Sequence, residues 1–162
     1  MENWDLRSVK NINTTKKVLQ ILSQKILLKL IYPVVVLDNG GLRTAEQQNE
    51  IYKQGFSECD GYNKKSYHQS GLAIDYVPKV NGVITWSNGL AFLSNAKVIL
   101  ECWDEMIEAG QTDGLFLHSG IFWNAKDLDG DGFLEVDDKL GWDMAHYELR
   151  EFEQKNRFKI KV

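Results

Sequence analysis

The sequence predicts an α+β fold: a single compact domain with a small, mostly antiparallel sheet flanked by helices. Three observations favour this class. Apolar residues recur at helical spacing in two long segments, short β-branched runs lie between turn residues, and the two kinds of segment are neither segregated nor in strict βαβ order. With 162 residues, of which 43% are hydrophobic, the chain is long enough to bury one core.

The first third of the chain predicts a helix, a buried strand and a second helix. Residues 18–30 carry apolar side chains at helical spacing, and Pro33 ends that pattern. The β-branched run at 34–37 predicts a strand. Thr44-Ala-Glu-Gln47 has the form of a capping box, so we expect a short helix from there to Lys53.

The middle of the chain predicts a hairpin followed by a long helix. Residues 72–77 and 83–86 have the composition of short strands, and Asn81-Gly82 between them is typical of a tight hairpin turn. Apolar residues then line one face of a helix that we expect to run from about 88 to 109. Gly110 is placed to end it.

The last third predicts strand pieces at 115–117 and 121–123 and a final helix from about 144 to 154. No internal repeat, low-complexity tract or linker interrupts the sequence. We therefore expect one domain that spans residues 1–162.

The net charge of −4 depends on one segment. Residues 127–138 hold six acidic residues and no basic one, which leaves 17 acidic residues against 19 Lys and Arg elsewhere. The sequence has no concentrated basic patch, so we expect no nucleic-acid partner. Lys29 and Pro33 interrupt the longest apolar stretch before it reaches the ~18 residues of a membrane span, so we expect no stable membrane association.

The cysteines and the N-terminal residues indicate the cellular compartment in which we expect the protein. Cys59 and Cys102 are not part of a Cys-x-x-Cys pair, and we interpret both as small packed side chains. The N-terminus lacks a basic region followed by an apolar stretch, which predicts no signal peptide and a cytoplasmic location. A monomer is the expected state.

Two segments together supply the ligands that suit a catalytic zinc ion, which takes three protein ligands and leaves one position open. Ser66-Tyr-His68-Gln-Ser-Gly71-Leu-Ala-Ile-Asp75 provides a histidine and an aspartate, and His146 provides the third group. A separation of seven residues would put His68 and Asp75 on opposite faces of one strand. We therefore expect Gly71 to lie in a turn or bulge that brings both onto one face.

Asp143 lies three residues before His146. At the start of a helix these two residues would share a face. Asp143 could then stand beside the metal without binding it, which suits a general base.

These segments resemble the zinc D-alanyl-D-alanine / L-alanyl-D-glutamate peptidases of peptidoglycan, especially the branch used by phage endolysins. The resemblance rests on Gly41-Leu-Arg43-Thr44, the run 66–75, the run 78–86, and Asp143-x-x-His146-x-Glu148-Leu149. It implies a hedgehog or D,D-peptidase-like fold, with zinc on His68, Asp75 and His146 and with Asp143 as acid/base. Dipeptidases and carboxypeptidases of the wider family have Glu where this chain has Asp143. In having Asp at this position, the chain resembles the endolysin branch, whose members cut between L-Ala and D-Glu of the stem peptide.

The resemblance also implies roles for residues around the metal. Arg43 would steer the substrate or stabilise an oxyanion, although Gly-Leu-Arg-Thr alone would equally fit a surface ion pair. Ser66 could orient a ligand or bind substrate, or could serve only the turn. Glu148 is expected to be a partner of a ligand or a surface acid, and His118 to be structural or part of the site wall.

The acidic segment 127–138 matches an EF-hand-type loop. Its carboxylates at positions 1, 3, 5 and 12 and the main-chain carbonyl at position 7 predict a calcium site at Asp127, Asp129, Asp131, Phe133 and Asp138. Glu135 could coordinate directly or through water. Asp138 replaces the usual Glu at position 12, which could admit magnesium. Some relatives carry a calcium-responsive loop here, and because only four residues separate Asp138 from Asp143, we expect calcium to order the catalytic segment.

The favoured function is therefore a zinc endopeptidase that cuts the stem peptide of peptidoglycan at L-Ala–D-Glu. It would act as a phage or prophage endolysin with no separate wall-binding domain and would reach the wall through another factor such as a holin. Two alternatives stay open. One is a D-alanyl-D-alanine carboxypeptidase or dipeptidase on the same scaffold, and the other is a non-catalytic module that binds zinc and calcium.

Overall fold

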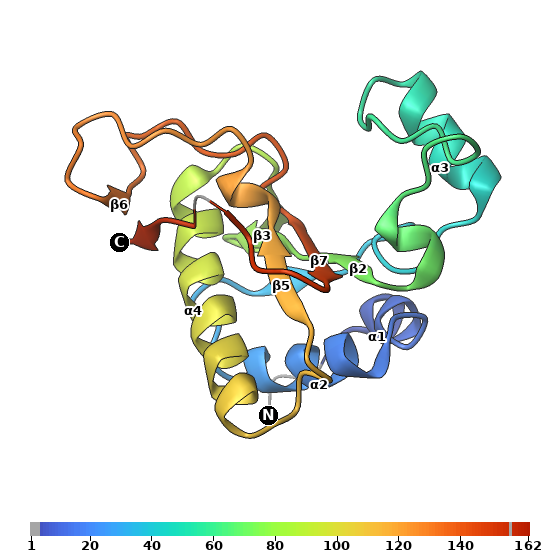
Figure 1. The fold of residues 1–162 in the computed structure, drawn as a ribbon, viewed down its shortest axis with the longest axis horizontal. Coiled ribbons are helices and arrows are strands. Elements are labelled where there is room, and N and C mark those ends of the chain that lie inside the picture. Colours follow the sequence, from blue (N-terminus) through green and yellow to red (C-terminus); the bar gives the residue numbers. More distant parts are fainter. Residues whose placement is uncertain (1–3, 156) are drawn as a thin grey trace.

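Four helices and three small sheets make up the part of the chain that the computed structural model describes, residues 4–155 and 157–162 (Figure 1). This arrangement confirms the α+β class. The helices are α1 (Leu6–Ile12), α2 (Lys17–Ile26), α3 (Ala45–Lys53) and α4 (Gly89–Glu108), with 3-10 turns η1 (Tyr67–Ser70) and η2 (Gly120–Phe122). The strands are β1 (Val34–Val35), β2 (Ala73–Asp75), β3 (Val77–Val80), β4 (Val83–Ile84), β5 (Phe116–Ser119), β6 (Phe133–Leu134), β7 (His146–Arg150) and β8 (Lys159–Ile160).

The sheet that positions the site is antiparallel and has the order β2-β7-β5. Its register places Asp75 opposite His146 and His118 opposite Glu148. Side chains alternate along a strand, so His146 and Glu148 point to one face of β7 and Tyr147 points to the other. The face that carries Asp75, His146 and Glu148 is the polar face of this sheet.

The other two sheets are smaller. β1, β3 and β4 form an antiparallel sheet in that order, and β6 pairs with β8 in parallel. The turn between β3 and β4 has positive φ at both Asn81 (52°) and Gly82 (79°), as a type I′ hairpin requires. This confirms the predicted turn and the strand that follows it. The strand that precedes the turn is β3, however, because β2, within the predicted strand 72–77, pairs with β7.

The hydrophobic core lies on the other face of the central sheet, where α2 packs against α4. Figure 1 shows α4 along one side of the strands and α1 and α2 below them, whereas α3 stands to the right. Fully buried side chains include Trp103, Leu19, Leu22, Ile74, Leu93, Ile99 and Met106. The core therefore forms a rigid support from which the polar face of β2 and β7 projects.

Two of the predicted helices are confirmed in type and position. The side chain of Thr44 accepts a hydrogen bond from the main-chain nitrogen of Gln47, and the Gln47 side-chain oxygen accepts one from the main-chain nitrogen of Thr44, which completes the capping box of α3. Asn88 caps α4 by accepting from the main-chain nitrogen of Ala91.

The helix expected over 18–30 is confirmed as α2, but it ends earlier than predicted, at Ile26. Other predicted elements are wrong. The segment 121–123 predicts a strand, but residues 121 and 122 belong to η2. The predicted helix at 144–154 is strand β7, because the segment lies between β2 and β5 and pairs with both. Nothing in the periodicity predicts α1, which Asp5 caps. Among the described residues, no helix combines the length and apolar character needed to cross a membrane.

Candidate metal site and the surrounding cleft

His68 is held in place by the short turn η1. The Ser66 side chain caps this turn by accepting from the main-chain nitrogen of His68, and Gly71 ends it with φ +68°, in the left-handed region. The turn thus provides the change of direction expected at Gly71. The Nδ1 atom of His68 lies 2.7 Å from the carbonyl oxygen of Gly41. A carbonyl can only accept, so Nδ1 carries the proton and Nε2 has a free lone pair.

Asp75 ends strand β2, and Arg43 holds one of its two oxygens. An Nη atom of Arg43 lies 2.6 Å from Asp75 Oδ2. Arg43 itself donates to the carbonyl of Asn39 and, over 3.2 Å, to the side chain of Gln48. Only 11% of the Arg43 side chain is exposed. The guanidinium is therefore fixed, and it leaves Asp75 Oδ1 free to face the two histidines.

His146 begins strand β7, and Glu148 holds its Nε2 atom. Glu148 Oε2 lies 3.0 Å from His146 Nε2, and the other carboxylate oxygen of Glu148 is paired with Arg150. The Arg150 guanidinium lies over the ring of Tyr67, 4.9 Å from its centroid. This chain of contacts directs His146 Nδ1 towards Asp75, and it connects β7 to η1.

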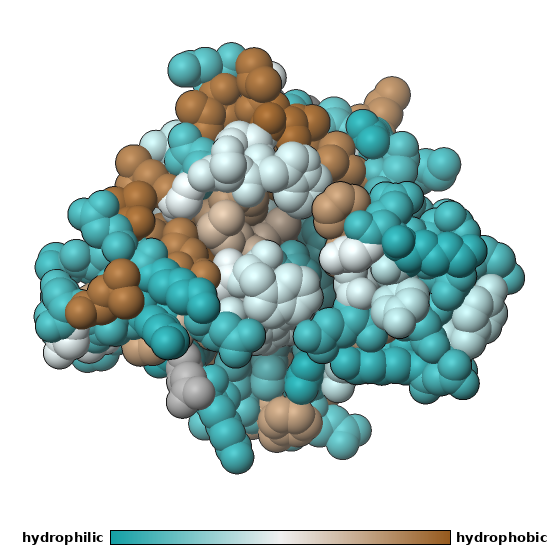
Figure 2. Space-filling model, turned by 90° about the horizontal axis from the view of Figure 1, so that it is seen from above, coloured by the Kyte–Doolittle hydropathy of each residue, from teal (hydrophilic) through white to brown (hydrophobic). Residues whose placement is uncertain are grey.

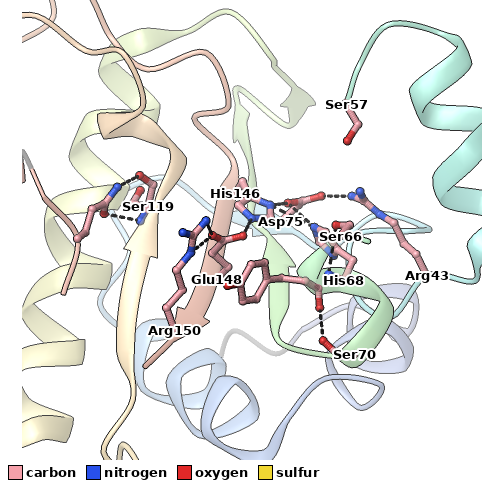
Figure 3. Close-up of polar contacts among 12 residues, drawn as sticks. Arg43, Ser57, Ser66, His68, Ser70, Asp75, Ser119, His146, Glu148 and Arg150 are labelled. Carbon is pink, nitrogen blue, oxygen red and sulfur yellow. Dashed lines mark hydrogen bonds and ion pairs between the residues drawn. The ribbon is translucent and has the colours of Figure 1, made fainter. Parts of the chain in front are cut away.

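These contacts leave one potential ligand atom free on each of His68, Asp75 and His146. The three free atoms converge on one point (Figure 3). His68 Nε2 lies 3.2 Å from both His146 Nδ1 and Asp75 Oδ1, and the last two atoms are 3.0 Å apart. Ligand atoms around a tetrahedral zinc, bound at about 2.0–2.1 Å, are separated by about 3.3 Å. The triangle therefore fits the base of such a site, and each ligand is oriented by a second hydrogen bond, as metal ligands usually are.

The charges of the site favour metal binding. Burial lowers the pKa of His68, so its imidazole is neutral and can act as a ligand. Burial opposes ionisation of Asp75, but His68, Arg43 and His146 hold its pKa well below the usual range. Burial also opposes the charged form of His146, but bonds to Asp75 and Glu148 raise its pKa to about 10. A metal at Nδ1 would take the place of that proton.

Asp143 lies in the turn that precedes β7, not at the start of a helix as predicted. The main-chain nitrogen of His146 donates to the Asp143 carbonyl over 3.1 Å, so the two residues are still close. Asp143 lines the same cleft as the three ligands. Burial raises its pKa to about 6, with a smaller opposing effect of His146. The group is thus ionised at neutral pH, although it is a better proton acceptor than an exposed aspartate.

Two glycines hold the Asp143 segment against η2. A Cβ atom on Gly120 would lie 2.1 Å from the carbonyl oxygen of Asp143, and one on Gly141 would lie 2.0 Å from that of Gly120. The main-chain nitrogen of Gly141 also donates to the Ile121 carbonyl over 2.7 Å. Backbone contact of this closeness is open only to glycine. It fixes the position of Asp143 relative to the metal ligands.

The site lies in a cleft of about 1600 Å³. Figure 2 shows a hollow bordered by weakly polar residues, between the mainly hydrophilic lobe that contains α3 and the opposite side of the molecule. The lining includes the basic side chains of Lys64, Lys65 and Lys139 and the acidic side chains of Glu58 and Asp143. The cleft therefore presents groups of both charges around the three converging side chains.

The structure distinguishes between the alternative roles expected for Glu148 and His118. Glu148 is a buried partner of His146 and not a surface acid. His118 is structural, because its Nε2 atom donates to the Phe152 carbonyl over 2.6 Å. Cys59 and Cys102 are both free thiols and belong to neither group of converging ligands.

The acidic segment brings three of its predicted ligands together. Carboxylate oxygens of Asp127, Asp129 and Asp131 lie within 4.8 Å of one another. Amides of Gly130 and Gly132 donate to Asp127, over 2.6 and 2.7 Å. Asp138 is used differently. Its two oxygens accept hydrogen bonds from the main-chain nitrogens of residues 128 and 135, both over 2.8 Å, and it is not part of the cluster of three.

Known proteins resemble this chain in sequence and in fold. The model of a family described as phage L-alanyl-D-glutamate peptidase matches residues 3–150. An L-alanyl-D-glutamate peptidase of Escherichia phage T5 is 32% identical over 143 residues, which cover 88% of this chain and 93% of the relative. The crystal structure of the Serratia marcescens L-Ala D-Glu endopeptidase ChiX has the same fold, with a TM-score of 0.63 and 23% identity, over 91% of this chain and 89% of that one.

The contact between η2 and the Asp143 segment yields a prediction. In Gly120→Ala the added methyl group must displace the Asp143 backbone, and we expect turnover to fall roughly a hundredfold, as misplacement of a reacting group by about 1 Å can cause. Bound zinc should stay stoichiometric, because His68 and Asp75 are untouched. Peptide hydrolysis and metal analysis would be measured together.

Gly89→Ala is the matched control, since a Cβ there would approach side chains and no backbone atom, with the end of the flexible Leu140 side chain at 3.0 Å and a methyl group of Val136 at 3.9 Å. Its turnover should stay near that of the unmodified protein. Normal turnover in Gly120→Ala would show that the close contact does not position Asp143.

Proposed function

The chain belongs to the phage L-alanyl-D-glutamate peptidase family, and we propose that it is a zinc enzyme that cuts the L-Ala–D-Glu bond in the stem peptide of peptidoglycan. The single observation that carries the zinc assignment is the convergence of His68 Nε2, Asp75 Oδ1 and His146 Nδ1, each on a side chain whose other polar atom is already engaged. Two imidazole nitrogens and one carboxylate would form a catalytic rather than a structural zinc set, because three protein ligands leave a fourth position open.

Each residue around this point would have a separate role in hydrolysis. Zinc would polarise the scissile carbonyl and acidify its water. The Asp143 carboxylate, with its pKa raised by burial, would accept a proton and deliver it to the nitrogen of the leaving D-glutamate. Arg43 would act first by holding Asp75 in position, and its place in the cleft lets it also attract the substrate carboxylate. Ser66 would support His68 through the turn.

The endopeptidase assignment is favoured over the two alternatives. The matching family and the phage relative are both described as L-alanyl-D-glutamate peptidases, which favours that bond over a D-alanyl-D-alanine terminus. A module that only binds zinc would have no need of a half-buried carboxylate beside the ligands, and Asp143 is such a group.

The first test is chemical. Digestion of purified sacculi should release stem peptides with a new N-terminal D-glutamate, identified by mass spectrometry. His68→Ala and His146→Ala should each lose bound zinc and activity together. The assignment of ligands fails if His146→Ala keeps stoichiometric zinc, and the assignment of the bond fails if the new termini are D-alanine.

Asp143 is tested by Asp143→Asn, which keeps the size of the side chain and removes its basicity. Because a general base contributes roughly two to four orders of magnitude, kcat should fall by that factor while bound zinc and melting temperature stay unchanged. Turnover close to that of the unmodified protein would rule out Asp143 as the base. Glu148 is poorly placed to act as the base instead of Asp143, because His146 and Arg150 already engage its two carboxylate oxygens.

We further propose that the loop 127–138 binds a divalent cation, with calcium as the expected ion, and that binding supports activity. The convergence of Asp127, Asp129 and Asp131 supports a cation site, and the backbone donors to Asp127 lower its pKa. The loop is joined to the catalytic segment at its base, where Lys126 and Lys139 exchange two backbone hydrogen bonds of 2.8 and 3.1 Å. Four residues lead from Asp138 to Asp143, which gives the loop a short path to the base.

Calcium dependence is tested by titrating free calcium at constant zinc. A ligand that binds only the folded form stabilises it by about 2.7 kcal/mol at a hundredfold excess over Kd, so melting temperature and wall lysis should rise together. The double variant Asp127→Ala, Asp129→Ala should lose this response and keep its zinc. A flat response of the unmodified protein at every calcium concentration would remove the regulatory role.

A further inference from the structure

Two tryptophans form a tilted ring pair, with an angle of 36° between the ring planes, that continues to a residue of the candidate metal site. Trp123 follows η2 and Trp142 directly precedes Asp143. Their ring centroids are 5.4 Å apart, and the centroid of Trp123 is 5.1 Å from that of the His146 ring. Both line the cleft. The chain therefore places an aromatic surface beside a metal ligand and next to the expected base.

The outer ring of this pair is open to solvent. The Trp142 residue is 53% exposed, although its contact with Trp123 covers part of the indole. Trp86 and Phe56 are exposed in the same cleft, but among the described residues neither makes a ring contact that links it to His146. A large, exposed aromatic surface next to a reactive site is typical of a binding surface.

The chemistry of the substrate indicates what such a surface would bind. This step rests on the proposed function. The first residue of the stem peptide is L-alanine, whose side chain is one methyl group and too small to cover an indole. Its amino group is joined through a lactyl group to the N-acetylmuramyl sugar. An enzyme that cuts after this residue must therefore accommodate a sugar ring within about two residue lengths of the scissile bond, or roughly 7 Å.

A pyranose ring fits an exposed indole, because its C–H groups form an apolar face that packs on an aromatic ring while its hydroxyl and acetamido groups stay in water. Charge does not identify a place for the sugar, because the basic residues of the cleft lining come from separate segments, with Lys64 before η1 and Lys139 before Asp143. The tryptophan pair does identify one, because its ring contacts reach His146. We propose that Trp142, supported by Trp123, is the subsite for the N-acetylmuramyl sugar on the acyl side of the cut bond.

The test compares two substrates with one peptide sequence. One is the muramyl peptide, and the other is the same stem peptide with an N-acetyl group in place of the sugar. The unmodified protein should have a higher kcat/KM for the muramyl peptide. Trp142→Ala should lower that value about tenfold, within the range of aromatic stacking energies, and should change kcat/KM for the acetylated peptide less than twofold. Trp142→Phe should recover part of the loss.

Phe56→Ala is the matched control, because it removes an exposed aromatic from the same cleft without touching the tryptophan pair. Its ratio of kcat/KM for the two substrates should equal that of the unmodified protein. Zinc content and melting temperature of Trp142→Ala, measured in parallel, should be unchanged.

Three results would overturn the sugar subsite: an equal loss on both substrates in Trp142→Ala, no loss on either, or no preference of the unmodified protein for the muramyl peptide. These are distinct from failure of the proposed function, in which the unmodified protein would cut neither substrate at L-Ala–D-Glu. That last result would overturn both.

Discussion

The antiparallel pairing of β2 with β7 is the constraint on which the site depends. It places Asp75 directly opposite His146, and the next residue on the same face of β7 is Glu148. A shift of this pairing by one residue would turn His146 and Glu148 into the core and bring Tyr147 and Leu149 to the cleft. Burial of Tyr147 and Leu149 among the core residues therefore fixes the register, and in doing so it fixes the position of His146 opposite Asp75 in the candidate metal site.

A line of alternating charges continues from this pairing. Arg43, Asp75, His146, Glu148 and Arg150 follow one another through direct contacts. Charges in a buried site cost several kcal/mol each unless they are paired, and removal of one partner of a buried pair costs roughly 3–5 kcal/mol. The two arginines at the ends balance the two carboxylates, so that Asp75 and Glu148 stay ionised around His146. The same contacts decide which atom of each ligand faces the metal.

The sequence predicts the site better than it predicts the fold around it. Ligand type and spacing predict the cluster of His68, Asp75 and His146, which the structure brings together, because zinc chemistry limits the choice of side chains and Gly71 marks the required turn. The helix predicted at 144–154 is wrong, although the alternation of His146, Glu148 and Arg150 with Tyr147 and Leu149 already has the period of a strand. The i, i+3 spacing of Asp143 and His146 predicts a helix, whereas a turn before a strand produces the same proximity.

Other features depend on tertiary contacts that no local pattern contains. The partner of Asp75 is Arg43, 32 residues away in the chain. The position of Asp143 depends on glycine contacts between η2 and the segment before β7. Asp138 fits the loop pattern as a ligand, yet it is engaged by main-chain nitrogens of its own loop. Trp123 and Trp142 are 19 positions apart in the sequence and form one surface only because those segments pack together.

The most direct test of the account is a crystal structure of the protein with zinc bound. The account predicts zinc on Nε2 of His68, Oδ1 of Asp75 and Nδ1 of His146, at about 2.0–2.2 Å, with Glu148 still hydrogen-bonded to Nε2 of His146. Zinc on Nε2 of His146, or coordinated by Glu148 itself, would contradict the claim that partners of the ligands select the atoms that bind the metal.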